Sequence, residues 1–261
     1  MDAMDMVKAS HIRGLIASGK REDGRDAYSF RDIKITAGLL GNAEGSAEVR
    51  MGDTRVLAGV KLQIEEPMED TPNQGNLIMS GELLPLASEM YETGPPSASA
   101  IEFGRVVDRG IRHGNCIDLK SLFIEEEKVW TVFIDLYVLN YDGNLFDAGT
   151  MAAMAALMNT KVPKVEDGEA VRTERKTPLK IDNIIGSTTF AKIKDKLILD
   201  PSGDEELAAD CRLTIATDAE KVRSMQKGLS GGLFKNEIDE LLGVSFNKYK
   251  EIKDILTKAQ V

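Results

Sequence analysis

The chain has 261 residues, of which 42% are hydrophobic and 29% are charged, the balance of an ordinary globular protein. Its formal net charge of −10 means that the surface as a whole does not attract nucleic acid, although a few clustered lysines and arginines can still hold phosphates locally. The sequence has no apolar run near the roughly 18 residues of a membrane span, and no apolar signal-peptide segment. Its two cysteines are too few for a disulfide framework, and its two histidines are too few for a His-rich metal site. We expect a cytoplasmic protein with no membrane association.

The first hundred residues predict one helix and then strands. Residues 1–20 predict a short amphipathic helix that ends at Gly19. Residues 28–64 predict strands, including a hairpin in which a Gly-Asp turn joins residues 47–51 to residues 55–64. Residues 65–100 contain five of the eight prolines but are apolar in patches, which predicts a long, packed connection.

The middle of the chain predicts two helices around two strands. Residues 101–113 predict a helix, and residues 119–125 and 130–140 predict strands. The second strand is nearly continuous in apolar β-formers, so we expect it to be central and buried. After a turn at residues 141–144, the Ala- and Met-rich residues 149–159 predict a helix that packs closely on a sheet.

The last hundred residues repeat this order on a smaller scale. Residues 163–180 are polar and charged and predict an exposed connection. Strands are predicted at residues 187–193, 197–199 and 211–216. The spacing of Thr217 and Glu220 matches a capping box and predicts a helix through Lys227, and residues 234–258 predict a final helix.

This order of elements predicts a mixed α/β (α+β) fold. We expect an N-terminal helix at residues 1–20, a larger part at residues 21–165, and a smaller C-terminal part at residues 186–258. Both cysteines, Cys116 and Cys211, lack a CxxC partner and are interpreted as packing residues.

Residues 14–20 match the first part of a phosphate-binding P-loop. The pattern then fails, because Arg21 stands where the magnesium-binding Ser or Thr belongs and no strand precedes the loop. A helix that ends at a glycine explains these residues better. A nucleotide-dependent enzyme with an unrelated α/β fold therefore remains an alternative, but the weakest one.

Three arginines lie on one face of the predicted helix over residues 101–113. Arg105, Arg109 and Arg112 stand at i, i+4 and i+7, and planar guanidiniums in a row suit a string of phosphates. From spacing alone, a solvated face with an ion pair to Asp108 is the simpler interpretation.

An acidic cluster lies between two predicted strands. It consists of Asp204, Glu205, Glu206 and Asp210, whose carboxylates could hold Mg²⁺. A charged loop with a helix cap is the simpler interpretation, so no metal and no resident cofactor are predicted.

Several ordered motifs resemble the RNase PH family. They are residues 21–25, residues 44–47, residues 51–57, residues 103–112 and the pair Asp142-Gly143. The resemblance runs from about residue 20 to the C-terminus, and its ordered set is far more specific than any single piece. It implies an RNase PH fold of mixed β-sheets packed with helices.

Further stretches resemble the catalytically silent RNase PH-type subunits of the archaeal exosome. They are residues 70–73, 83–88, 94–96, 105–112 and 141–148. This resemblance implies a hexameric ring of alternating active and silent subunits, which degrades single-stranded RNA from its 3′ end with phosphate as the attacking group. It also implies RNA-binding cap subunits on one face of the ring.

One departure from the active family pattern matters most. Active members resemble one another in an Asp-Gly-Gly-Thr-Arg stretch whose Thr and Arg grip the inorganic phosphate, and here Leu145 and Phe146 take those two places. We call Gly143, Asn144, Leu145 and Phe146 the degenerate phosphate loop. Without the guanidinium, both binding energy and charge neutralisation for a phosphate dianion are lost.

The resemblance also bears on the acids and on the arginine helix. Active members keep two acids six residues apart, and Asp204 with Asp210 has that spacing. This pair is interpreted either as a remnant of those acids or as side chains that satisfy local amides, and no catalytic residue is predicted. The resemblance places the arginine helix near the RNA path, which favours RNA contact by Arg109 and Arg112, then Arg105. The predicted function is a non-catalytic, RNA-binding ring subunit; the alternative is an active phosphate-dependent 3′-to-5′ exoribonuclease that recruits other arginines.

Overall fold

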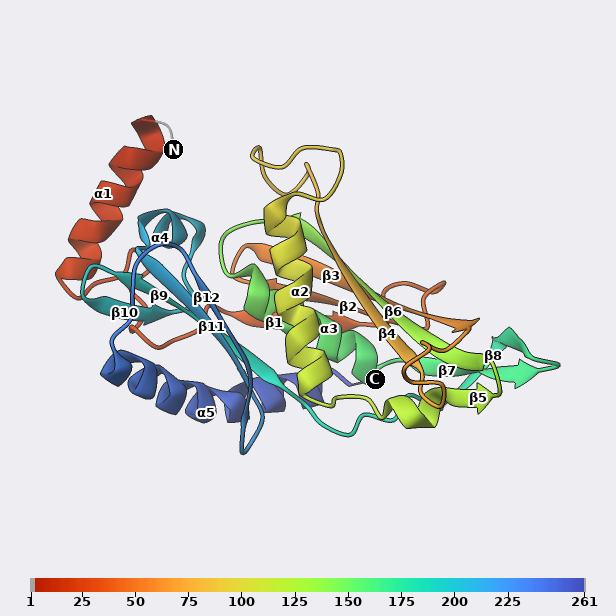
Figure 1. Cartoon of the computed structure of the whole chain (residues 1–261). Coiled ribbons are helices and arrows are strands. Elements are labelled where there is room, and N and C mark those ends of the chain that lie inside the picture. The colour runs from red at the N-terminus through yellow and green to blue at the C-terminus, as the bar shows by residue number, and fades with distance from the viewer. Residues whose placement is uncertain (1–2, 261) are drawn as a thin grey trace.

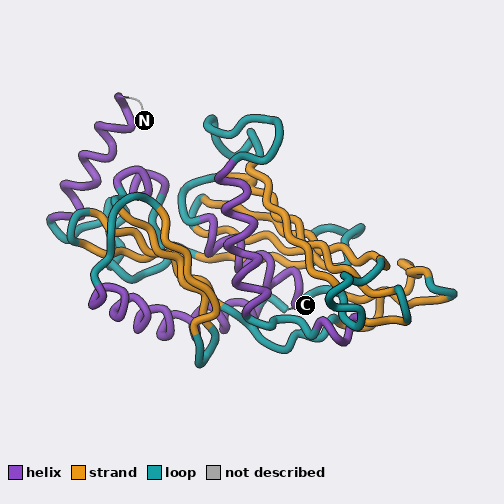
Figure 2. Tube along the Cα trace, in the orientation of Figure 1, coloured by secondary structure: helices purple, strands orange, loops and turns teal. Residues whose placement is uncertain are grey.

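A computed structural model of the chain describes residues 3–260, without the side chains of residues 174–176. Two sheets and their helices form two packed halves that lie side by side (Figure 1). A large sheet belongs to the first half, a smaller one to the second, and a two-stranded hairpin extends from the large sheet at the far end (Figure 2).

The large sheet has six strands. Five of them follow the spatial order β1-β2-β3-β6-β4, and the short strand β5 also pairs with β6. Their bounds are β1 (Ile33–Ala37), β2 (Gly45–Met51), β3 (Thr54–Glu65), β4 (Asn76–Leu83), β5 (Phe123–Glu125) and β6 (Lys128–Asn140). Side chains of β3 alternate between fully buried and half-buried, as expected for a sheet with one covered face. Strand β6 lies between β3 and β4, which confirms its predicted central position.

Helices α2 (Ala98–His113) and α3 (Leu145–Met158) cover that buried face. All 14 residues of α3 are buried, because it contacts β2 and β3 on one side and strand β9 (Gly186–Ile193) of the second half on the other. Gly149 allows α2 to approach, since a Cβ atom there would lie 2.5 Å from the Phe103 ring. Helix α3 is therefore the common core element of both halves.

The second half is a four-stranded antiparallel sheet in the order β10-β9-β11-β12. Its elements are β9 (Gly186–Ile193), β10 (Lys196–Leu199), α4 (Gly203–Ala208), β11 (Cys211–Thr217), β12 (Val222–Gly228) and α5 (Lys235–Lys258). Helix α5 contacts β9 and β11 and buries Leu241, Tyr249, Ile252 and Leu256. Helix α1 (Ala3–Ala17) packs on α4 through Ile12 and Ile16.

Two predicted connections and one predicted strand are wrong in part. The connection at residues 65–100 contains β4, an edge strand parallel to β6. Residues 119–122, expected in a strand, form the 3₁₀ helix η1 (Leu119–Leu122). Residues 163–180 are not a loose connection but the hairpin of β7 (Lys161–Glu166) and β8 (Glu169–Pro178), whose turn residues Asp167 and Gly168 both have positive φ.

The predicted helix after Thr217 is also wrong, because residues 222–228 form β12. The Asp218 carboxylate accepts hydrogen bonds from the backbone N–H groups of Glu220 and Lys221, at 2.8 and 2.7 Å. These bonds close a tight turn that returns the chain along β11, in place of a first helical turn. The capping box of this half lies instead at Ser202 and Glu205, where α4 begins.

Candidate functional site: the degenerate phosphate loop and the arginine helix

The degenerate phosphate loop joins the end of β6 to the start of α3. Asn144 has left-handed φ and ψ angles of 50° and 51° and is the N-cap of α3, so the helix starts at Leu145, four residues earlier than predicted. Leu145 and Phe146 are both buried in the core. Their side chains pack inside the protein, and neither carries a hydroxyl or a cation.

Phe146 lies against an arginine from the other half of the chain. The Arg212 guanidinium of β11 stands 4.4 Å from the Phe146 ring centroid, which is cation–π distance, and the ring also contacts Phe103 with centroids 6.4 Å apart. The same guanidinium makes a 2.7 Å ion pair with Glu102 of α2. A cation is thus present beside the loop, but Glu102 already neutralises it.

Arg31 holds the backbone of the loop. Its guanidinium donates to the Gly143 carbonyl and to both the carbonyl and the carboxylate of Asp142. It also makes a bidentate pair with Asp200, with N–O distances of 2.8 and 3.0 Å. Burial works to raise the pKa of Asp200, but the Arg31 guanidinium outweighs it and holds that pKa below its usual range.

A buried polar network connects the loop to β9. The Asn144 side-chain amide donates to Asp200 at 2.7 Å and to Asp147 at 2.9 Å. Asp147 in turn accepts from the backbone N–H and the hydroxyl of Thr189, at 2.7 and 2.8 Å. Burial raises the pKa of Asp147 to about 6. The network fixes the loop against the second half of the chain.

Glu206 of α4 also contacts residues 141–144. Its carboxyl accepts a 2.6 Å hydrogen bond from the Tyr141 hydroxyl and a 2.9 Å bond from the backbone N–H of Asn144. Burial raises the pKa of Glu206, against the opposing effects of these two donors and of the Arg212 and Arg31 guanidiniums. The acidic cluster seen in the sequence therefore has one member with a role in the loop.

The other members of that cluster are paired elsewhere. Glu205 makes a bidentate, almost fully buried ion pair with Arg21, at 2.6 and 2.8 Å. Asp204 pairs with Lys8 at 3.2 Å and Asp210 with Arg13 at 2.8 Å, both on α1. Within residues 3–260, the structure places no three His, Cys, Asp or Glu side chains close enough together to hold a metal ion.

The arginine face of α2 forms as predicted, opposite the buried Phe103, Val107 and Ile111. Its three members differ in their contacts. Arg112 makes the expected pair with Asp108 at 2.7 Å and also donates to the Leu77 carbonyl. Arg109 donates to Gln226 of β12 at 2.8 Å, and Arg105 is exposed.

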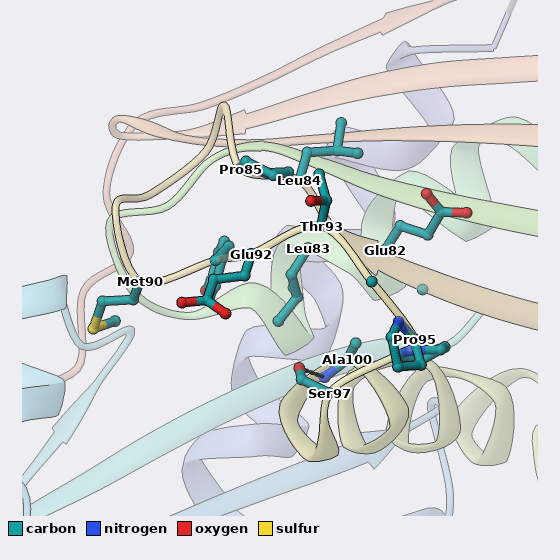
Figure 3. Close-up of a pocket in the computed structure, with 14 residues that line it drawn as sticks. Glu82, Leu83, Leu84, Pro85, Met90, Glu92, Thr93, Pro95, Ser97 and Ala100 are labelled. Carbon is teal, nitrogen blue, oxygen red and sulfur yellow. Dashed lines mark hydrogen bonds between the residues drawn. The ribbon is translucent and has the colours of Figure 1, made fainter.

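A cavity of about 600 Å³ lies beside the N-terminus of α2, under the loop that follows β4 (Figure 3). Glu82 and Glu92 are among the residues that line it, and none of the described lining residues is basic. A cavity with two carboxylates and no described cation does not suit a phosphodiester chain.

The predicted P-loop residues belong to the end of α1. Gly14 lies inside the helix, and Gly19 follows its last residue with a φ of 75°. The structure thus agrees with a helix that ends at a glycine. Among the helices of residues 3–260, none is long and apolar enough to cross a membrane. Both cysteines are buried, which confirms that they are packing residues.

The site residues that escaped sequence reasoning include Arg31, Glu102, Arg212 and Gln226. Their partners across the site are between 110 and 169 positions away in the chain. Local spacing carries no signal for contacts at that separation.

Models of two adjacent domains match most of the chain. The first, described as 3′ exoribonuclease family, domain 1, matches residues 29–163, and the second, domain 2 of that family, matches residues 183–248. The chain belongs to the RNase PH family. This confirms the family and the fold that the sequence motifs indicated.

Curated relatives of this RNase PH chain are exosome components. The exosome complex component Rrp42 of Thermococcus gammatolerans is 44% identical over 265 residues, which cover 99% of this chain and 97% of the relative. The protein of the same name from Methanothermobacter thermautotrophicus is 41% identical over 264 residues, with the same two coverages.

Solved structures agree with this result. One chain of an Archaeoglobus fulgidus exosome with RNA bound to the active site is 42% identical, with a TM-score of 0.91 over 97% of this chain and 99% of that chain. An archaeal exosome core gives a TM-score of 0.87 at 39% identity, over 97% and 98%. Rice Rrp46, at 18% identity and a TM-score of 0.69 over 92% and 100%, shows only the shared fold.

Proposed function

We propose that this chain is a non-catalytic, RNA-binding subunit of an archaeal-type exosome ring. In that ring it alternates with an active RNase PH-type partner, and the assembly degrades RNA from the 3′ end with phosphate. The similarity to Rrp42 components and to chains of archaeal exosome structures supports the assignment to this complex. RNA-binding cap subunits and a cytoplasmic location belong to the same proposal.

The observation that carries the non-catalytic assignment is the burial of Leu145 and Phe146. A phosphorolytic enzyme must bind and orient a phosphate dianion beside an already anionic RNA chain. Here the two side chains that would grip the phosphate are apolar and turned into the core. The two guanidiniums beside the loop are both paired, Arg212 with Glu102 and Arg31 with Asp200. Asp204 and Asp210, as remnant acids, pair with α1 and have no role in catalysis.

For RNA contact we propose the arginine face of α2. Arg105 is exposed, and Arg109 donates only to neutral oxygens, those of the Gln226 side chain and the Arg105 backbone, so both can turn to a phosphate without breaking an ion pair. Arg112 must give up or share its pair with Asp108, which makes it the weakest of the three contacts. Contacts of this kind position a strand without reading its sequence.

The proposal is tested by incubating the purified chain with a 5′-labelled oligoadenylate, Mg²⁺ and phosphate. We expect no shortening of the RNA by the chain alone, and a phosphate-dependent ladder with release of nucleoside diphosphate once the active partner is added. A ladder from the chain alone would support the alternative, an active exoribonuclease, and would overturn the non-catalytic assignment.

A further inference from the structure

A second surface of the chain lies at the N-terminal end of α2. The cavity of about 600 Å³ there is lined mostly by apolar residues, which come from the end of β4 and the loop between β4 and α2 (Figure 3). Three large apolar side chains beside it face solvent: Leu86 is 74% exposed, Met90 65% and Ile101 52%. Each of them either lines the cavity or directly follows a residue that does. We call these three residues the cavity rim, and exposed apolar residues grouped in this way are typical of an interaction site.

The loop that carries the rim is packed against the protein behind it. Ala87 is buried, and its carbonyl accepts a 3.1 Å hydrogen bond from the backbone N–H of Tyr141. The Tyr91 ring packs on the Tyr141 ring, with centroids 5.7 Å apart. These anchors stand next in sequence to Leu86 and Met90. The two rim side chains are therefore held at the surface, and a partner molecule is needed to cover them.

The charge around the rim is of one sign. Residues 62–104 contain eight aspartates and glutamates and no lysine, arginine or histidine. Glu82, Glu89 and Glu92 are exposed at the cavity or in its loop, and no cation in the described part of the chain forms an ion pair with them. Such a surface repels RNA, and two copies of it placed face to face would bring like charges together. Charge complementarity therefore favours a protein partner that carries lysine or arginine.

The rim is continuous with the arginine face of α2. Ile101 and Arg105 stand at i and i+4 of this helix, so their side chains are neighbours on its surface. Both side chains are exposed. A partner that covers Ile101 would therefore also lie beside Arg105.

We propose that the cavity and its rim are a docking site for a partner protein that presents apolar side chains flanked by lysine or arginine. The inference rests on the proposed function, under which this partner is the active RNase PH-type subunit. Its apolar side chains enter the cavity and cover the rim, and its cations pair with Glu82, Glu89 and Glu92. A partner docked in this way lies beside Arg105, so RNA held by the arginine face of α2 lies at the junction of the two subunits.

Two double variants test the two parts of the docking site. Leu86→Ser with Met90→Ser removes apolar contact area, and Glu89→Lys with Glu92→Lys reverses the charge. All four side chains are exposed, so we expect both variants to fold, and thermal unfolding of each variant alone checks this.

A third double variant is the matched control. Glu126→Lys with Glu127→Lys makes the same change of charge at the exposed turn between β5 and β6. It therefore separates a local effect at the cavity from an effect of net charge.

Association of each protein with the purified active subunit is measured by titration calorimetry at two salt concentrations, and the mass of the assembly by sedimentation velocity. We expect each rim variant to weaken association by about tenfold or more, and the control to associate like the unaltered chain. The loss caused by charge reversal should shrink at the higher salt concentration, because salt screens exposed charges.

Unaltered affinity of both rim variants for the active subunit would overturn the inference. Self-association of the unaltered chain that the rim variants lose would assign the surface to a second copy. Loss of oligoadenylate binding by the rim variants, with normal assembly, would assign it to RNA. Either result would also overturn the proposed partner.

The same measurements separate this inference from the proposed function. An unaltered chain that does not assemble with the active subunit would contradict the proposed function, and this inference with it. An unaltered chain that assembles with the active subunit, together with rim variants that assemble equally well, would contradict only the docking site.

Discussion

The Arg21–Glu205 pair shows how a single side chain can anchor an element. Both side chains are at most 3% exposed, and the Arg21 guanidinium also donates to the carbonyls of Leu199 and Asp200. The pair joins the segment after α1 to the start of α4. Removal of either partner leaves an uncompensated buried charge.

We therefore predict that Arg21→Ala lowers the free energy of unfolding by about 3–5 kcal/mol. Arg50→Ala is the matched control, because the Arg50 side chain is exposed and its partner Glu48 keeps a second pair with Arg55, and an exposed ion pair contributes less than about 1 kcal/mol. Denaturant unfolding of the two variants measures both values. Equal, small losses for Arg21→Ala and Arg50→Ala would contradict the importance of the buried pair.

Asp147 gives the site a measurable pH dependence. Its pKa in the folded chain is raised from 3.8 to about 6 because the carboxyl is buried, so the folded state holds this proton more tightly than the unfolded state. Its contribution to stability is complete below pH 3.8 and is lost as the pH rises to about 6. Over that range the loss amounts to about 3 kcal/mol.

Asp147→Asn cannot titrate, and it is less stable than the unaltered chain because its amide faces the donors of Thr189 and Asn144. The difference in unfolding free energy between the two proteins should therefore shrink as the pH rises from about 4 to about 7. Unfolding free energies of both proteins, measured across this pH range, check the prediction. A difference that stays constant with pH would show that Asp147 has an ordinary pKa.

At the scale of elements, the packing of α2 against α3 depends on a glycine. A Cβ at Gly149 would meet the Phe103 ring at 2.5 to 2.7 Å. We predict that Gly149→Ala destabilises the fold by about 1–3 kcal/mol despite the better helix propensity of alanine. Gly243→Ala on α5, where nothing lies within 4 Å, should instead stabilise it by about 0.5–1 kcal/mol.

Thermal unfolding of the two glycine variants separates packing from helix propensity. Opposite signs for Gly149→Ala and Gly243→Ala support the close contact of α2 and α3. Stabilisation by both substitutions would show that the Phe103 ring moves aside without cost.

The arginine face of α2 is the RNA contact that we propose for this chain. We predict that Arg105→Ala with Arg109→Ala weakens oligoadenylate binding by the assembled ring, and that each lost phosphate contact lowers the salt slope by about 0.7. The assay uses a partner whose catalysis is disabled, so that the RNA stays intact. Arg50→Ala, on β2, is the control, and an unchanged salt slope in the double variant would place the RNA elsewhere.

The elements also show where sequence patterns succeed. Strong local periodicity predicted β2, β3, β6, β9, β11 and α5 close to their observed bounds. The many charged residues of β7 and β8 led to the prediction of an exposed connection instead of a hairpin, although Asp167-Gly168 is a typical hairpin turn. The T-x-x-E spacing at Thr217 was misleading, because Asp218 uses its side chain to close a turn before β12.

The site itself was predictable only in part. Leu145 and Phe146 stood out because a known motif fixes what belongs at those positions. The partners that close the site, Glu206, Arg212 and Glu102, come from α4, β11 and α2, and only the fold brings them together. No local pattern contains that information.

At the scale of the whole molecule, α3 and the loop before it connect two halves that an active homologue would use for catalysis. In this chain the same junction is filled by apolar side chains and internal ion pairs. The chain thus keeps the fold of the family. Under the proposed function, it forms part of a ring and contacts RNA, and its partner carries out the chemistry.

The most direct test of this account is to disable the partner alone. A ring is assembled from this chain, unaltered, and an active partner in which the phosphate-gripping arginine of the Asp-Gly-Gly-Thr-Arg stretch is replaced by alanine. Phosphate-dependent release of nucleoside diphosphate from labelled oligoadenylate is then measured. We predict that the assembled ring loses all phosphorolysis, and residual phosphate-dependent degradation by that ring would contradict the account.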